Sequence, residues 1–66
     1  MGKVLTAQKV KNLPVGTDVI LVRDGTGKSG KLWVIKSGRK KMLRGVMVIH
    51  EIADRPGWHY EEAETS

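Results

Sequence analysis

The chain has 66 residues and no cysteine, so it is a single small domain in which disulfide bonds and thiolate-bound zinc are excluded. Its formal net charge is +5 at pH 7, and that charge is uneven: residues 1–48 carry +9 (eleven Lys and Arg, two Asp) and residues 49–66 carry −4 (one Arg, five Asp and Glu). A basic body of this kind predicts a polyanionic partner; the alternative is an ordinary soluble domain with scattered lysines.

The core must be built from aliphatic side chains, because the sequence contains no Phe and few other aromatic residues. Dimerisation is a plausible supplement to so small a core. The longest apolar run is Val46–Ile49, far short of the roughly 20 residues that a membrane span needs. The expected location is therefore the cytoplasm, and no membrane partner is expected.

The first element lies in Lys3–Leu13 and has two interpretations. Thr6 is a suitable N-cap for a short helix that carries Val10 on its apolar face. An extended strand at Val4–Thr6 followed by a helical turn fits nearly as well. Pro14 then ends the element, because the residue before a proline disfavours the α conformation.

Thr17–Arg23 is the clearest strand, because four consecutive β-preferring apolar residues indicate burial on both faces. Asp24–Gly30 is predicted to be a loop, since it has three glycines in seven residues. Lys31–Lys36 is predicted to be the second strand of this region. Ser37–Lys40 then turns the chain.

Lys41–Ile49 is predicted to be one strand interrupted at Gly45, where a glycine indicates a bulge or a sharp bend. His50–Ala53 either continues it or begins a further strand. Asp54–Gly57 is a predicted turn, and Trp58–Glu62 is the last predicted strand. The pattern is mainly β and predicts a small SH3-like antiparallel barrel of four or five strands, with a candidate short N-terminal helix.

The predicted domain organisation is a single domain spanning residues 1–66. Within it we expect an N-terminal segment (1–14), the barrel (15–62) and a frayed tail (63–66). The glycine–lysine loop also suggests a nucleotide-binding P-loop. That motif is excluded, because Val22 stands at the first glycine in one register and Leu32 at the magnesium-binding hydroxyl in the other.

Val15–Val46 resembles the KOW motif of large-subunit ribosomal proteins and NusG-type transcription elongation factors. The similarity is carried by Val15-Gly16, Val19–Val22, Gly27–Leu32 (GKSGKL, close to the family's G-K-x-G-K-V) and Leu43–Val46. It covers about half of the chain, and the first loop is one residue shorter than is usual in the ribosomal members.

The resemblance implies an SH3-like barrel with a glycine-rich, lysine-bearing loop between two strands. It also implies that the loops bind RNA or protein and that the domain has no catalytic activity. The central glycine of the motif, Gly30, would serve the backbone turn.

A basic hairpin is the strongest candidate for a binding site, because no Asp or Glu occurs between Gly25 and His50. Its cations would contact phosphates and release counterions; the alternative is a solvated hairpin tip that discourages edge pairing. The candidate nucleic-acid-binding residues are Lys28, Lys31, Lys36, Arg39, Lys40, Lys41 and Arg44.

The aromatic residues are secondary candidates. Trp33 is expected in the core, whereas Trp58 and Tyr60 share one face of the last strand and could stack on a base or contact a partner, although packing in the core or at an edge is favoured for them. His50 and His59 lack a partner at metal-ligand spacing. The acidic run Glu61, Glu62 and Glu64 is interpreted as a solvated tail.

No nucleophile–base set or carboxylate pair is recognisable, so no catalytic residue, metal site or cofactor is predicted. The first hypothesis is a small, basic, non-enzymatic module that binds nucleic acid, with RNA slightly favoured over DNA. The alternative is an SH3-like protein-interaction or assembly module, acting as a homo-oligomer or an adaptor.

Overall fold

The computed structural model describes residues 3–63, which form one antiparallel sheet of six strands and one short helix. The elements in chain order are β1 (Val4–Leu5), α1 (Ala7–Lys11), β2 (Asp18–Arg23), β3 (Ser29–Ser37), β4 (Lys40–Arg44), β5 (Ile49–Glu51) and β6 (Trp58–Glu62). The order across the sheet is β1-β6-β2-β3-β4-β5, so β1 and β5 are its edges.

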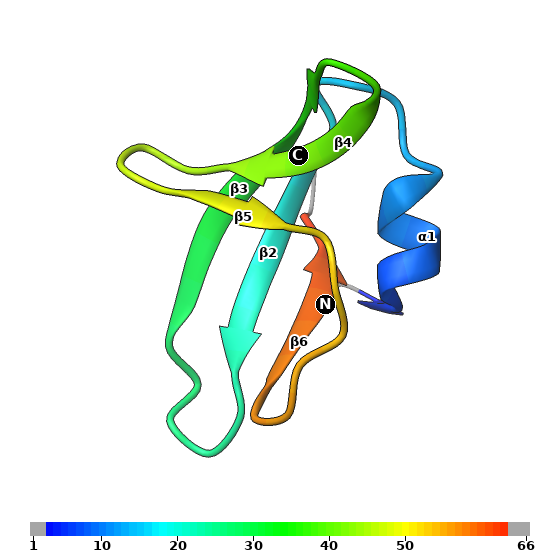
Figure 1. Cartoon of the computed structure of the whole chain (residues 1–66). Helices are drawn as coiled ribbons and strands as arrows, with labels where there is room; N and C mark the ends of the chain where they lie inside the picture. Colours follow the sequence, from blue (N-terminus) through cyan, green and yellow to red (C-terminus); the bar gives the residue numbers. More distant parts are fainter. Residues whose placement is uncertain (1–2, 64–66) are drawn as a thin grey trace.

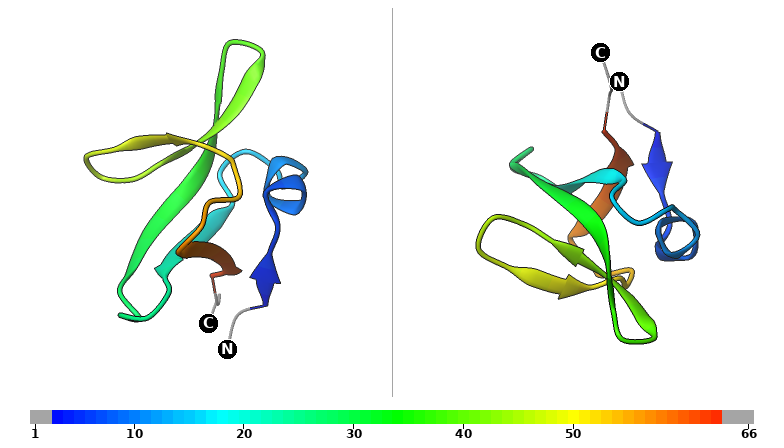
Figure 2. Two further views of the ribbon diagram at one scale, coloured as in Figure 1. Left: turned by 60° about the horizontal axis from the view of Figure 1, so that its bottom comes forward. Right: turned by 90° about the horizontal axis from the view of Figure 1, so that it is seen from above.

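The sheet is strongly coiled. Strands β2 to β5 form a meander of three hairpins, and β6 returns to pair with β2 on its other side. In Figure 1 the β4–β5 arm crosses in front of β2 and β3, while α1 lies to one side of the sheet. Figure 2 shows the β3–β4 and β4–β5 hairpins projecting from the body in different directions. The long strand β3 therefore belongs both to the body and to a projecting arm.

The core lies on the inner face of the coiled sheet and follows the period-2 alternation of the strands. In β3, Leu32 and Val34 are buried, while the intervening Trp33 is only half-buried on the outer face. The buried set is Leu5, Ala7, Val10, Val19, Leu32, Val34, Leu43, Ile52 and Tyr60. Each large aliphatic member contributes about 2 kcal/mol by leaving water.

Helix α1 is only five residues long and depends on its caps and its packing. The Thr6 hydroxyl accepts a hydrogen bond from the Lys9 amide at 3.3 Å, and the Asp54 carboxylate accepts one from the Ala7 amide at 3.0 Å. Val10 is fully buried. The two interpretations of the N-terminal segment therefore both hold in part, with a two-residue strand preceding a capped helical turn.

The mainly β character, the N-terminal helix and the strands at residues 18–23, 31–36 and 58–62 are confirmed. The glycine-rich loop is shorter than predicted, because β3 already begins at Ser29. Gly30 pairs with Leu21 inside the sheet, and the positive φ angles of the loop belong to Gly25 and Gly27. The expectation that Gly30 forms the turn is therefore wrong.

The prediction of one strand over Lys41–Ile49 is also wrong, although the sharp bend expected at Gly45 is present. Strand β4 ends at Arg44, and the chain reverses through Val46 and Met47 before β5 begins. The Gly45 amide donates to the Val48 carbonyl at 2.8 Å, which closes this tight hairpin. The apolar residues Val46–Ile49, whose composition is typical of a buried strand, therefore lie mainly at an exposed hairpin tip.

The last connection differs by one residue from the predicted turn. The Trp58 amide donates to the Arg55 carbonyl at 3.3 Å, and Gly57 has a φ of 85°. Pro56 at the second position and a positive φ at the third are typical of a type II turn. Glu61 and Glu62 belong to β6 and not to a solvated tail, whereas Glu64 lies outside the described residues.

Within residues 3–63, no helix has the length and apolar character needed to cross a membrane.

Substitution of Gly45 by alanine should destabilise the fold by about 1–2 kcal/mol through overpacking. The added Cβ would lie 2.8 Å from Cδ2 of Leu32 and 3.1 Å from Cγ2 of Val48, and Leu32 is buried. Urea unfolding measures the change. Gly30→Ala is the matched control, because a Cβ at that strand position meets nothing within 4 Å. Equal stability of the two variants would contradict this packing argument.

Candidate nucleic-acid interface

The seven predicted cations do not form one surface. Lys36, Arg39, Lys40 and Lys41 gather at the β3–β4 hairpin, whereas Lys28 lies in the loop at the opposite end of β3. Eight residues of extended chain separate Lys28 from Lys36, which corresponds to roughly 26 Å. Lys28 is therefore not part of the basic hairpin.

The basic hairpin, which we define as residues 36–41, is a regular two-residue turn. Lys36 pairs with Lys41 and Ser37 pairs with Lys40 across the two strands. Gly38 has a φ of 63°, and Arg39 follows it at the tip. A glycine with positive φ at the first turn position suits the right-handed twist of a hairpin. The turn therefore presents Arg39 at the end of a projecting ribbon.

The four cations of the basic hairpin differ in their contacts. Lys40 forms an ion pair with Glu51 at 2.9 Å, and this contact lowers the pKa of the Glu51 carboxyl. The Lys41 ammonium donates to the Leu13 carbonyl at 2.7 Å and is half-buried. Lys36 and Arg39 are exposed and form no ion pair with the described residues. Lys41 thus anchors the hairpin, while Lys36 and Arg39 remain available for a ligand.

The other two candidates lie on the outer face of the sheet. Lys31 is 3.4 Å from the Asp18 carboxylate, which partly neutralises it. Arg44 is exposed and stands opposite Trp33 on the neighbouring strand. The expectation that Trp33 is a core residue holds only in part, because its ring is half-buried on this outer face.

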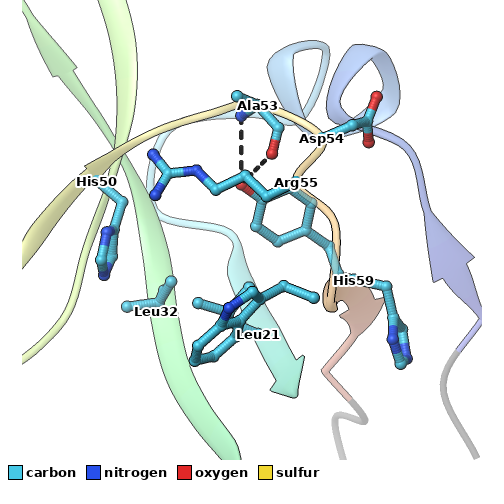
Figure 3. A pocket seen from close by; sticks show the side chains of 9 residues that line it. Leu21, Leu32, His50, Ala53, Asp54, Arg55 and His59 are labelled. Carbon is cyan, nitrogen blue, oxygen red and sulfur yellow. Dashed lines mark hydrogen bonds between the residues drawn. The ribbon is translucent and has the colours of Figure 1, made fainter. Parts of the chain in front are cut away.

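Trp58 and Tyr60 point to the same side of β6 but differ in access. Trp58 is 39% exposed, whereas Tyr60 is 4% exposed. The Tyr60 hydroxyl donates to the Ala53 carbonyl at 2.9 Å and accepts from the Ala53 amide at 3.2 Å (Figure 3). Tyr60 is therefore a core residue with a satisfied hydroxyl, and Trp58 alone can stack on a ligand.

A pocket of about 150 Å³ opens beside Trp58. Its lining comes from four strands and the connection before β6, and includes Leu21, Leu32, His50, Ala53, Asp54, Arg55, Trp58, His59 and Tyr60. In Figure 3 the Arg55 side chain extends across the pocket toward His50. The pocket was not predicted from the sequence, because its lining residues follow no regular spacing. The one sequence feature that could have indicated it was the Arg55-Pro56-Gly57 turn directly before an aromatic residue.

The tip of the β4–β5 hairpin was also missed as a surface feature. Val46 is 87% exposed and Met47 is 92% exposed. The neighbouring Val48 and Ile49 are exposed as well. Isolated exposed apolar residues are ordinary, but four in succession at a projecting tip indicate a contact surface.

His59 lies between two carboxylates on the outer face of the sheet. Its Nδ1 is 2.5 Å from Asp24 and its Nε2 is 2.5 Å from Glu61. A neutral imidazole can donate from only one nitrogen, so both hydrogen bonds require the imidazolium. The hydrogen bonds to Glu61 and Asp24 accordingly raise the pKa of His59 above its ordinary value of 6.5. Within residues 3–63, no group of three or more His, Cys, Asp or Glu side chains could hold a metal ion.

Comparison with known proteins adds no further assignment. No protein-family model matches this sequence, and no curated protein or solved structure is significantly similar to it.

The raised pKa of His59 predicts a pH-dependent stability. The stabilisation by the charged imidazole should be present in full below pH 6.5 and be lost as the pH rises through the raised pKa of the folded state. Thermal unfolding across about pH 5 to 9 measures this dependence. His59→Gln should remove this fall in thermal stability with rising pH. His50→Gln is the matched control and should retain it. An unchanged profile in His59→Gln would exclude the effect.

Proposed function

We propose that this protein is a small non-enzymatic module that binds nucleic acid through the basic hairpin, with RNA slightly favoured over DNA. The observation that carries the proposal is the concentration of four cations within the six residues 36–41 of a projecting ribbon. Among the described residues, Glu51 is the one acidic side chain that forms an ion pair with this group.

The electrostatics of the hairpin favour a polyanion over a single acidic ligand. Lys36 and Arg39 lie on one projecting arm and approach a phosphate chain without first breaking an ion pair to the described residues. Each phosphate that they neutralise releases condensed counterions, which drives binding without sequence readout. Arg39 at the turn can additionally grip a phosphate with two hydrogen bonds.

The finer fold proposal is an SH3-like barrel of the KOW type. Its support is the meander of short strands and the position of the Gly27–Leu32 motif, which spans the end of the β2–β3 loop and the start of β3. That position agrees with the glycine-rich loop between two strands that the resemblance implies. Binding by loops and hairpins, without catalysis, follows from the same resemblance.

A second candidate function is protein interaction or assembly. The observation that favours it is the exposed apolar tip at Val46 and Met47, which lies on a different hairpin from the basic group. Burial of apolar side chains from a projecting tip in a pocket on a partner stabilises the complex.

The hairpin proposal predicts a change in the salt dependence of binding. In the double variant Lys36→Gln/Arg39→Gln, the slope of log K against log salt should fall by about 1.4 for a single strand, if each cation contacts one phosphate. Fluorescence anisotropy with labelled RNA over roughly 50 to 200 mM salt measures the slope. The variant Lys3→Gln/Lys9→Gln removes the same charge from exposed positions elsewhere and should change the slope less. Equal slopes in the two variants would show that the hairpin does not contact the nucleic acid.

The assembly proposal is tested with the variant Val46→Ser/Met47→Ser. If the apolar tip mediates self-association, the variant should remain monomeric at concentrations where the parent protein forms dimers in sedimentation experiments. Val15→Ser changes an exposed valine of a different loop and should leave association unchanged. A parent protein that is monomeric throughout would count against homo-oligomeric assembly.

A further inference from the structure

We propose that the pocket beside Trp58 receives one unpaired base of a single-stranded nucleic acid. This inference rests on the proposed function and adds to it the form of the ligand and a second contact site. The basic hairpin would track the phosphate chain, and the pocket would hold a base that has left its stack.

The size of the pocket restricts its occupant. The volume of the pocket is about 150 Å³. Pockets for drug-sized ligands measure roughly 300–1,000 Å³. The cavity is therefore too small for a whole nucleotide and fits one ring system.

The floor of the pocket is apolar and holds a flat aromatic surface. Leu21 and Leu32 contribute aliphatic groups, and Tyr60 is buried with its hydroxyl fully used by Ala53, so the aromatic surface is that of Trp58. The guanidinium of Arg23 lies 5.5 Å from the centroid of the Trp58 ring, and Arg23 does not line the pocket. A cation in this position holds the indole by a cation–π contact and leaves the ring as a platform on which a base can stack.

The rim of the pocket is cationic and suits the phosphates on either side of a bound base. Arg55 extends across the opening toward His50 (Figure 3). Arg23 pairs with Trp58 across two strands, and its amide donates to the Lys28 carbonyl at 2.8 Å. Two inter-strand spacings place Lys28 roughly 10 Å from Trp58. Lys28, which is too far from the basic hairpin, is thus near enough for its long side chain to reach a phosphate next to a bound base.

Asp54 is the one acidic residue of the lining, and it is already engaged in the fold. The Asp54 carboxylate accepts the Ala7 amide of helix α1. His59 contacts Asp24 and Glu61, and in Figure 3 its ring points away from the other lining side chains. Arg55 therefore lines an apolar pocket, with Arg23 against Trp58 and Lys28 in the loop just before the neighbouring strand β3. This combination favours a base with its phosphates over an uncharged proline-rich or apolar peptide.

The decisive experiment combines a protein variant with a change in the ligand. The probes are a labelled single-stranded DNA ten-mer and the same ten-mer with abasic sites in place of every base. In fluorescence anisotropy, Trp58→Leu should weaken binding of the intact strand about ten- to a hundred-fold, the loss expected for one stacked base. Its affinity for the abasic strand should equal that of the parent protein, because that strand has no base to stack.

A spectroscopic measurement provides a second test that does not depend on the stability of Trp58→Leu. In Trp33→Phe, the matched control, Trp58 is the one remaining tryptophan, and its emission should be quenched by the intact strand but not by the abasic strand. The affinity of Trp33→Phe for the intact strand should remain within about two-fold of the parent value, far below the loss expected for a stacking residue.

The outcomes separate this inference from the proposed function. If the parent protein binds both strands equally and Trp58 emission does not change, the pocket proposal is overturned while hairpin binding stands. If the parent protein binds neither strand nor labelled RNA at low salt, nucleic-acid binding itself is refuted. If Trp58→Leu alters only self-association, the pocket belongs to a protein contact and the inference fails.

Discussion

The hydrogen-bonded tie between Tyr60 and Ala53 holds the architecture together. Tyr60 sits in β6, which pairs with both β1 and β2, and its hydroxyl both donates to and accepts from the backbone of Ala53. That tie fixes the irregular connection between β5 and β6, which has no strand partner of its own. The position of the connection in turn brings Asp54 to the first turn of α1 and Arg55 to the pocket. The Tyr60 hydroxyl thus helps to position both the residue that caps α1 and the arginine that lines the pocket.

The same fold separates two kinds of cationic surface. The basic hairpin extends beyond the core, and its exposed Lys36 and Arg39 side chains form no ion pair with the described residues. Arg55 lies at a pocket whose apolar lining is supported by the core, so a ligand there would meet a preorganised site with little ordering cost. Arg39 of the basic hairpin lies at an exposed turn, whereas Arg55 lines the pocket beside the buried Tyr60. In the proposed function, the hairpin would supply non-specific attraction to a polyanion and the pocket would supply a defined contact.

Local sequence signals were sufficient for elements whose burial and propensity agree. Strand β2 was predictable from its continuous apolar run, in which Leu21 is the one residue that is not β-branched, and α1 was predictable from the Thr6 cap. The strand prediction for Val46–Ile49 failed because an exposed apolar hairpin tip has the same composition as a buried strand. The feature that distinguishes the tip is the close approach of Gly45 to Leu32, which exists only in the folded structure. The basic hairpin was predictable because its four cations lie within six consecutive residues. The pocket was not, because its walls meet only after the sheet has coiled.

The cross-strand pairing within the basic hairpin has a consequence for folding energetics. Lys36 stands directly opposite Lys41, with Arg39 and Lys40 beside them, so like charges face one another across the ribbon. Such pairs oppose strand pairing in the absence of counter-charge. Dissolved anions should therefore tighten the end of the ribbon, and its amide protons should exchange more slowly as ionic strength rises. The cations proposed to attract a polyanion therefore also oppose the strand pairing of this arm until counter-charges neutralise them.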